Sequence, residues 1–272
     1  MSIAFTKMSG SGNDFVVIDN REPVMENSAK RDFVSKICVP KLSVGADGVI
    51  FIENSDNADF KWDFYNADGS SAEMCGNGGR CVARYAYERK IAPKKMSFET
   101  TAGIITAEVK GSHVRIKMTS PEDLQRNLEI DVNGKAFKVD SLNTGVPHAI
   151  VYSDDIANED IRGIGRGIRI HSQFSPAGTN VCFVQKQGEN DLRVRTYERG
   201  VEDETLACGT GVVASALLSS LTGLVKPPVR VQTQGGEFLT VGFEKTNGDG
   251  DFGEIFLEGS AKIVFEGTVV EL

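Results

Sequence analysis

The sequence lacks the features that mark a membrane or secreted protein. No segment reaches about 18 consecutive apolar residues, the length needed to cross a bilayer. The first residues, MSIAFTKMSGSGND, have neither the charged start nor the unbroken apolar stretch of a signal peptide. We therefore expect a soluble protein of the cytoplasm that does not associate with membranes.

Cysteine and histidine are also scarce. Five cysteines are an odd number and too few for a disulfide framework, so we expect free thiols. Cys75 and Cys81 have no neighbouring cysteine or histidine at a spacing that would complete a tetrahedral zinc site. The sequence therefore predicts no metal.

Basic clusters are missing as well. The formal net charge is −8, and no run of lysine or arginine is interleaved with aromatic residues. Such a surface repels phosphate backbones, which argues against nucleic acid as a partner. With 40% hydrophobic and 25% charged residues, the 272-residue chain is typical of a globular protein, and its length favours two domains.

The chain instead contains an internal repeat. Cys75 in EMCGNGGRC and Cys208 in LACGTG lie 133 positions apart, and each precedes a helix-like segment. The same offset relates three further landmarks: Gly12 and Gly145, Gly45 and Gly178, and the Thr100/Gly103 and Thr233/Gly236 pairs. We interpret this ordered set as two copies of one structural unit.

Each copy has short, alternating β-type segments and one clear helix, over 79–90 and 210–223. This pattern predicts an α+β fold of two pseudo-symmetric domains in which strands dominate. We place an N-terminal domain at 1–118 and a C-terminal domain at 119–261, with 119–127 as the connection. The last strand-like segment, within 262–272, is left over after the second copy and is expected to complete the first domain.

A thiol at the start of a helix has chemical consequences. The helix N-terminus lowers cysteine pKa values from about 8.5 into a range of roughly 3.5 to 7.5. The glycines that follow Cys75 and Cys208 expose backbone N–H groups that suit a carboxylate. Either cysteine alone could be a small buried residue at a tight turn, but its recurrence in both copies favours chemistry.

Two such thiols, one from each copy, would face each other across a pseudo-twofold cleft. That arrangement suits inversion of a stereocentre, because one thiolate removes a proton from one face of a carbon and one thiol returns a proton to the other. N–H donors at the helix starts would stabilise the carbanion. Neither a pyridoxal lysine nor a metal is needed.

Five motifs and the spacings that join them carry a resemblance to a known family: MSGSGNDFVVID, GADG, YNADGSSAEMCGNGGRC, NTGVPH and YERGVEDETLACGTG. Over essentially its whole length the chain resembles the diaminopimelate epimerases. The resemblance implies cofactor-independent interconversion of LL- and meso-2,6-diaminopimelate, in lysine and peptidoglycan biosynthesis. It also implies two like domains, each a mostly antiparallel sheet or barrel around a central helix, and a homodimer with Phe265 near the contact.

The resemblance also assigns roles to residues of this chain. Cys75 becomes the proton donor and Cys208 the acceptor in the forward direction, and His148 and Glu198 tune the thiol pKa values. The implied substrate contacts are Asn13, Asn66, Gly76, Asn77, Asn180, Glu198, Arg199, Gly209 and Thr210. Two positions depart from the pattern, because some members have glutamine in place of Gly48 and asparagine in place of Val146.

Other interpretations stay open at this point. A proline-racemase-like enzyme also uses two cysteines, but typically has histidine in place of Asn77 and lacks YERG. A non-catalytic redox or binding protein could use the same scaffold. Isomerase-like relatives of the phenazine pathway also share it, but they lack the paired cysteines.

Overall fold

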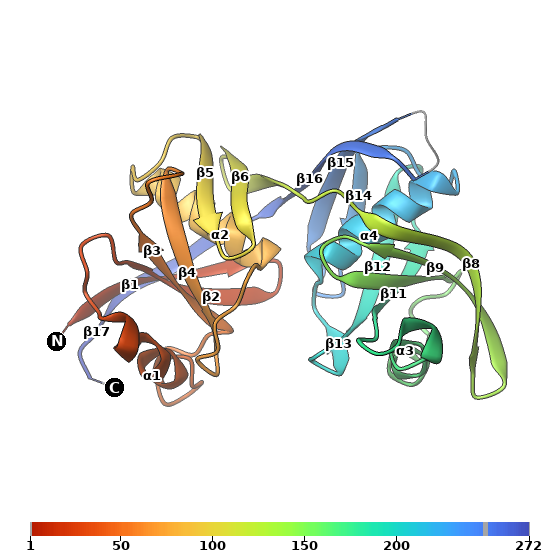
Figure 1. The fold of residues 1–272 in the computed structure, drawn as a ribbon, viewed down its shortest axis with the longest axis horizontal. Helices are drawn as coiled ribbons and strands as arrows, with labels where there is room; N and C mark the ends of the chain where they lie inside the picture. Colours follow the sequence, from red (N-terminus) through yellow and green to blue (C-terminus); the bar gives the residue numbers. More distant parts are fainter. Residues whose placement is uncertain (1, 247–249, 272) are drawn as a thin grey trace. The chain divides into compact units, whose positions relative to one another are not determined.

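The structure is a computed structural model that describes residues 2–246 and 250–271. It divides into two compact units (Figure 1): an N-terminal unit of Met1–Ile116 and Gly259–Leu272, and a C-terminal unit of Lys117–Glu258. The predicted domains begin at residue 1 and end at residue 272, which lie outside the described residues. That the units fold as independent domains stays a prediction.

The sheet of the N-terminal unit is mostly antiparallel. Its strands, in spatial order, are β17 (Lys262–Val269), β1 (Ile3–Gly10), β2 (Asn13–Asp19), β3 (Gly48–Glu53), β4 (Phe60–Asn66), β5 (Lys95–Thr100), β6 (Gly103–Lys110) and β7 (His113–Lys117). The β2–β3 and β4–β5 pairs are parallel, and the other neighbours are antiparallel. The last strand of the chain therefore pairs with the first.

The C-terminal unit repeats this order. Its strands are β8 (Glu122–Val132), β9 (Lys135–Asn143), β10 (Pro147–Tyr152), β11 (Asn180–Lys186), β12 (Asp191–Glu198), β14 (Val229–Gln232), β15 (Phe238–Lys245) and β16 (Phe252–Ser260). The β10–β11 and β12–β14 pairs are parallel. A short strand, β13 (Asp203–Thr205), adds to β12. Here β8 takes the place that β17 takes in the other unit.

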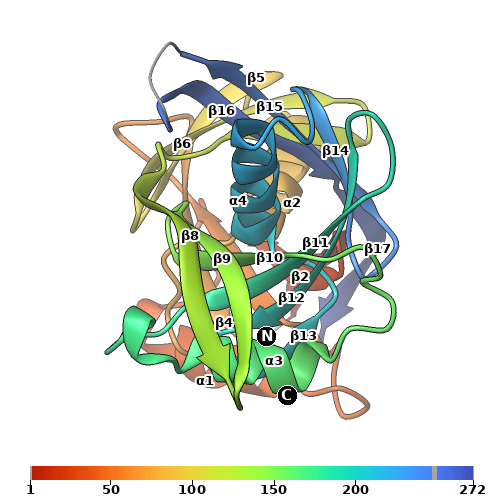
Figure 2. The same cartoon turned by 90° about the vertical axis from the view of Figure 1, so that its right-hand side faces the viewer.

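Each sheet wraps around one helix. In the N-terminal unit, α2 (Gly76–Glu88) contacts β1, β2, β3, β6 and β17. In the C-terminal unit, α4 (Gly209–Leu221) contacts β9, β10, β11, β12, β14 and β15, and Figure 2 shows strands of that unit on several sides of it. All residues of α4 from Gly211 to Ser220 are buried, as its apolar sequence predicts. The predicted α+β fold with a central helix in each copy is confirmed.

Two further helices were not predicted. The expectation of one helix per copy is wrong, because α1 (Asn27–Ile37) lies between β2 and β3 and α3 (Ile161–Arg169) lies at the equivalent place between β10 and β11. The sequence of α3, IRGIGRGIR, contains three glycines, which disfavour an isolated helix. These glycines permit close packing: a Cβ atom at Gly165 would lie 2.6 Å from Cβ of Tyr197. Tertiary packing therefore overrides the low propensity.

The expected connection over 119–127 is mostly strand. β8 begins at Glu122 and pairs with β9, although its register shifts twice before Leu128. Asp123 and Asn127 have positive φ angles of 55°, which lets the strand bend at the irregular positions. The polar residues that suggested a linker instead alternate on the exposed face of this strand.

Backbone conformation supports the repeat. Gly45 and Gly178 have φ angles of 69° and 72°, and Gly12 and Gly145 have φ angles of 95° and 108°. These left-handed conformations favour glycine, which explains why glycines recur at the common offset. No helix in the described part of the chain is long and apolar enough to span a membrane.

Candidate active site

Cys75 occupies the N-cap position of α2. Its backbone is extended, with φ −140° and ψ 119°, and its carbonyl accepts a hydrogen bond from the N–H of Gly79 at 2.8 Å. Gly76 and Asn77 are the first two residues of the helix, whose N–H groups have no acceptor within the helix. The half-buried thiol therefore stands beside a backbone site suited to a carboxylate.

Asn13 and Asn77, two of the predicted substrate contacts, lie together. Nδ2 of Asn77 donates to Oδ1 of Asn13 at 2.7 Å, and Nδ2 of Asn13 donates to Oδ2 of Asp47 at 2.9 Å. At the other end, Nη2 of the buried Arg80 donates to Oδ1 of Asn77 at 2.7 Å and to Oγ of Ser11 at 2.8 Å. Because a guanidinium only donates and a carboxylate only accepts, both amide orientations are fixed.

Asn66 and Gly48 pair across β3 and β4. Nδ2 of Asn66 donates to Oγ of Ser70 at 3.0 Å, which holds this exposed amide at the end of its strand. A Cβ atom at Gly48 would lie 2.5 Å from the carbonyl oxygen of Tyr65. A glutamine at this position would therefore require the strand to shift. The backbone at Gly48 does not accommodate the glutamine that some family members have there.

Cys208 occupies the equivalent N-cap position of α4. Its φ and ψ angles are −120° and 108°, and its carbonyl accepts from the N–H of Val212 at 2.9 Å. The side chain is more buried than that of Cys75, with 8% of the residue exposed, and Sγ lies 3.5 Å from Oγ1 of Thr210. The N-terminus of α4 thus repeats the arrangement at Cys75.

Burial decides the acidity of Cys208. It raises the pKa of the thiol well above its ordinary value, and the Glu198 carboxylate and Cys182 raise it further. The Thr210 hydroxyl and the N–H of Gly211 act in the opposite direction. The expectation that the helix start lowers this pKa is therefore wrong for Cys208, because loss of solvation outweighs the hydrogen bonds.

His148 lies directly behind Thr210. Its Nε2 atom is 2.9 Å from Oγ1 of Thr210, and the side chain is fully buried. Burial and, to a smaller extent, the nearby charge of Arg199 lower the pKa of His148 to about 3, so the imidazole is neutral at pH 7. His148 therefore reaches Cys208 through a hydroxyl group.

Asn180, Glu198 and Arg199 meet at the ends of β11 and β12. Oδ1 of Asn180 accepts from the backbone N–H of Arg199 at 2.8 Å, and its Nδ2 donates to the carbonyl of Pro147 at 3.2 Å. Burial raises the pKa of Glu198, and the Thr205 hydroxyl opposes this shift. The amide of Asn180 thus holds the segment that carries the acidic and basic side chains.

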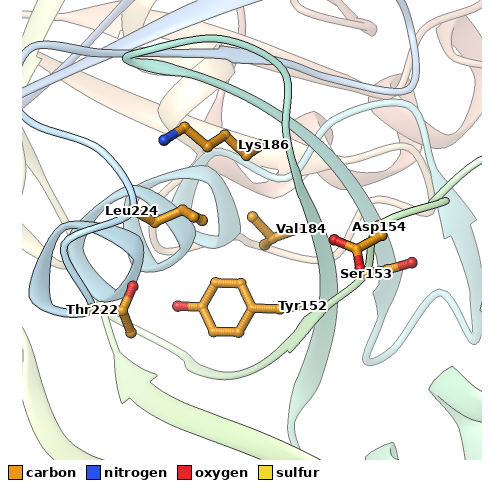
Figure 3. Close-up of a pocket in the computed structure, with 7 residues that line it drawn as sticks. All are labelled: Tyr152, Ser153, Asp154, Val184, Lys186, Thr222 and Leu224. Carbon is orange, nitrogen blue, oxygen red and sulfur yellow. The ribbon is translucent and has the colours of Figure 1, made fainter.

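A separate pocket lies at the far end of α4 (Figure 3). It is lined by Tyr152, Ser153, Asp154, Val184, Lys186, Thr222 and Leu224. Thr222 follows the last turn of α4, whereas Cys208 precedes its first turn. A helix of 13 residues is about 20 Å long, so this pocket is distinct from the thiol site.

Several neighbours of the predicted residues were not singled out from the sequence. They are Ser11, Asp47, Arg80, Cys182 and Thr196. Apart from the bond between Arg80 and Asn77 within α2, these contacts join different elements of the fold. Arg80 and Asp47 lie inside the motifs CGNGGRC and GADG, so motif membership was the available clue.

Solved structures share this fold at low sequence identity. A phenazine biosynthesis protein of the PhzF family from Bacillus anthracis superimposes with a TM-score of 0.75 at 15% identity, covering 100% of both chains. A probable proline racemase from Agrobacterium radiobacter K84 gives a TM-score of 0.72 at 16% identity, covering 98% of this chain and 93% of the other. These similarities concern the fold alone.

Sequence relatives are much closer. The diaminopimelate epimerase of Aquifex aeolicus (strain VF5) is 50% identical, covering 98% of both chains. That of Hydrogenobaculum sp. (strain Y04AAS1) is 46% identical, covering 97% of both chains. The family model described as diaminopimelate epimerase matches residues 5–123 and 141–264. With a cysteine at the start of the central helix in each repeat, the chain belongs to the diaminopimelate epimerase family.

Proposed function

We propose that this protein interconverts LL- and meso-2,6-diaminopimelate by exchanging the proton on one α-carbon, without a cofactor or metal. The observation that carries the proposal is the repeated placement of a thiol, Cys75 or Cys208, at the start of the central helix of each unit. Family membership supplies the substrate. The reaction belongs to lysine and peptidoglycan biosynthesis in the cytoplasm.

In the forward direction, the Cys208 thiolate takes the α-proton and the Cys75 thiol delivers a proton to the opposite face. The environment that raises the pKa of Cys208 makes its thiolate scarcer but also a stronger base, which suits a weakly acidic C–H bond. The two thiols exchange roles in the reverse direction. No other proton carrier is required for the inversion itself.

The substrate carboxylate at the reacting carbon binds the first N–H groups of the two central helices. Gly76 and Asn77 provide these donors on α2, and Gly209 and Thr210 provide them on α4. The same donors stabilise the negative charge that spreads onto the carboxylate when the carbanion forms.

The rest of the substrate binds side chains. Arg199 offers a guanidinium to a carboxylate, and Glu198 accepts from an ammonium group. The side chains of Asn13, Asn66 and Asn180 supply further hydrogen bonds. The side-chain amides of Asn13 and Asn180 are already held in orientation by the hydrogen bonds described above, before substrate binds.

The deciding experiment is incubation with LL-diaminopimelate in D2O, followed by mass spectrometry and chiral analysis. We expect meso product that carries one deuterium at an α-carbon. Loss of the α-proton requires a base, and its replacement requires solvent-derived hydrogen on the second thiol. Exchange with proline but not with diaminopimelate would instead support a proline-racemase-like activity.

The two thiols are tested by Cys75→Ser and Cys208→Ser. Because a hydroxyl is a far weaker acid than a thiol, each change should lower kcat by about a hundredfold or more. Cys38→Ala, which removes a buried thiol from the core beside α1, is the matched control and should retain activity. Full activity in either serine variant would remove that cysteine from the mechanism.

We also propose a homodimer with Phe265 at the contact. Phe265 and Val264 on β17 are 47% and 56% exposed, although both are large apolar side chains. The ring of Phe265 rests edge-on against Phe5, with centroids 5.9 Å apart. Phe265→Glu should shift the sedimentation coefficient from dimer to monomer. An unchanged coefficient would place the contact elsewhere.

A further inference from the structure

Cys182 is a fully buried thiol that the proposed reaction does not use. It lies on β11, with Sγ 3.6 Å from Nδ1 of His148 and 3.5 Å from Oγ1 of Thr196. A Cβ atom at Gly211 would lie 2.7 Å from this sulfur. Cys182 therefore fits against the first turn of α4 in the space that a glycine leaves.

These contacts form a continuous series that ends at Cys208. Sγ of Cys182 contacts Nδ1 of His148, and Nε2 on the other side of the same ring lies 2.9 Å from Oγ1 of Thr210. Oγ1 of Thr210 in turn lies 3.5 Å from Sγ of Cys208. All of these residues belong to the C-terminal unit. A change at Cys182 can therefore reach Cys208 through hydrogen bonds alone.

The donor and acceptor roles follow from the thiolate form of Cys208. A thiolate only accepts, so the single hydroxyl proton of Thr210 points toward it. The Thr210 oxygen then accepts from Nε2–H of His148. A neutral imidazole has one N–H, so Nδ1 is an acceptor, and Cys182 S–H is the donor that reaches it.

We propose that Cys182 is a positioning residue that fixes the tautomer of His148 and, through Thr210, directs a hydroxyl proton onto the sulfur of Cys208. Its importance for turnover rests on the proposed function of Cys208. Without the Cys182 donor, the proton of His148 moves to Nδ1, and the bare Nε2 draws the Thr210 hydroxyl away from Cys208.

Other groups around Cys208 stay the same when Cys182 is changed. Within the C-terminal unit, the other titratable and charged groups near this site, besides Cys182 itself, are His148 from β10, Glu198 at the end of β12, and Arg199, which follows it. The Cys182 thiol itself raises the pKa of Cys208, so its loss as a titratable group would lower the titration midpoint of Cys208. A rise in that midpoint on changing Cys182 therefore reports the loss of the hydrogen-bonded series.

The test compares Cys182→Ala with Cys182→Ser. The rate of Cys208 alkylation by iodoacetamide is measured against pH, with the modified peptide identified by mass spectrometry. The alanine variant lacks the donor, so its alkylation midpoint should rise by about one pH unit. The serine variant keeps an O–H donor, and its midpoint should stay within a few tenths of a unit of the parent. Cys38→Ala, the control, should not shift it.

Turnover provides a second measurement. With LL-diaminopimelate, kcat of Cys182→Ala should fall about tenfold while KM changes less than twofold, because the series acts on the base rather than on substrate binding. Cys182→Ser should recover most of this loss. A role in packing alone would instead affect both variants according to their lost volume.

Two outcomes overturn the proposal: an unshifted midpoint in Cys182→Ala, or equal shifts in the alanine and serine variants. If Cys182→Ala does not fold, Thr210→Val decides, since it removes the hydroxyl in a side chain of the same shape and should raise the midpoint. An unchanged alkylation midpoint in Thr210→Val would also overturn the proposal. Alkylation needs no substrate, so a parent protein without epimerase activity would refute the proposed function separately.

Discussion

Cys208 and His148 are titratable residues that both contact the Thr210 hydroxyl, and burial moves their pKa values in opposite directions. Burial disfavours the charged form of each, which is the thiolate of Cys208 and the imidazolium of His148. Both groups are therefore neutral in the structure at pH 7. Cys208 can therefore act as a base only after its thiol has lost its proton and the thiolate has been oriented.

The neutral state of His148 predicts acid sensitivity. Its folded-state pKa of about 3 lies below its usual value of 6.5, so the neutral ring stabilises the fold above pH 6.5. This stabilisation is lost as the pH falls from 6.5 toward 3, with a slope of about 1.4 kcal/mol per pH unit for one proton. Urea unfolding across this range should show that slope in the parent and a shallower one in His148→Gln.

The matched control for this measurement is His113→Gln, which changes an exposed histidine on β7. It should leave the pH dependence of the unfolding free energy as in the parent. An identical slope in the parent and in His148→Gln would show that other groups cause the acid sensitivity.

The sequence predicted individual site residues where they belong to a local motif or a repeated spacing. Cys75 and Cys208 follow from a repeated spacing, and the motif resemblance adds Asn13 and Asn77, which lie within hydrogen-bonding distance. Cys182 was not predictable, because its contact with His148 joins two strands separated by a long stretch of chain. The raised pKa of Cys208 also depends on burial, which the motif does not encode.

Among the elements, α3 shows how close packing can replace helix propensity. Its apolar positions Ile161 and Ile168 are buried, and Gly165 and Gly167 approach neighbouring side chains. A Cβ atom at Gly167 would overlap a methyl group of Val132 on β8. The glycines therefore serve contact rather than flexibility.

This contact predicts the sign of a glycine substitution. Gly167→Ala should destabilise the protein by about 1–3 kcal/mol through overpacking, although alanine favours an isolated helix by about 1 kcal/mol. Val132→Ala removes the obstructing methyl groups, so the double variant should recover at least about 1 kcal/mol relative to the sum of the single changes. Unfolding in urea measures all three variants. Additive effects would contradict the proposed overlap.

The helices differ in how far the sequence predicts them. α4 was predicted because its segment VVASALL is apolar apart from one serine, and α2 because apolar residues recur along CVARYAYE. α1 was missed because its buried face has few apolar residues, including Phe33, Val34 and Ile37, in a highly charged segment. Strands with clear alternation, such as β7 and β12, were easier to identify.

At the scale of the whole molecule, two units share one order of parallel and antiparallel strand pairs. The duplication was visible in the sequence because glycines and cysteines mark places where backbone conformation or chemistry allows little choice. Most other positions have diverged, since many apolar side chains can fill a core. The local patterns around Cys75 and Cys208 do not specify how far apart the two thiols lie.

Because the N-terminal and C-terminal units have separate cores, we expect the two units to unfold at different urea concentrations. The single tryptophan of the chain, Trp62, is buried on β4 of the N-terminal unit, so its fluorescence reports that unit. In Gly167→Ala, we expect the circular dichroism signal to begin falling at lower urea than the fluorescence signal. Destabilisation of the C-terminal unit accounts for the difference. Coincident transitions that both shift would mean that the units unfold together.

The pairing of β17 with β1 has a consequence for synthesis on the ribosome. The opening strand emerges first, yet its neighbour is translated only after the whole C-terminal unit has been made. We expect the C-terminal unit to complete its fold first. Until β17 is made, β1 of the N-terminal unit has an unpaired edge that chaperones can shield.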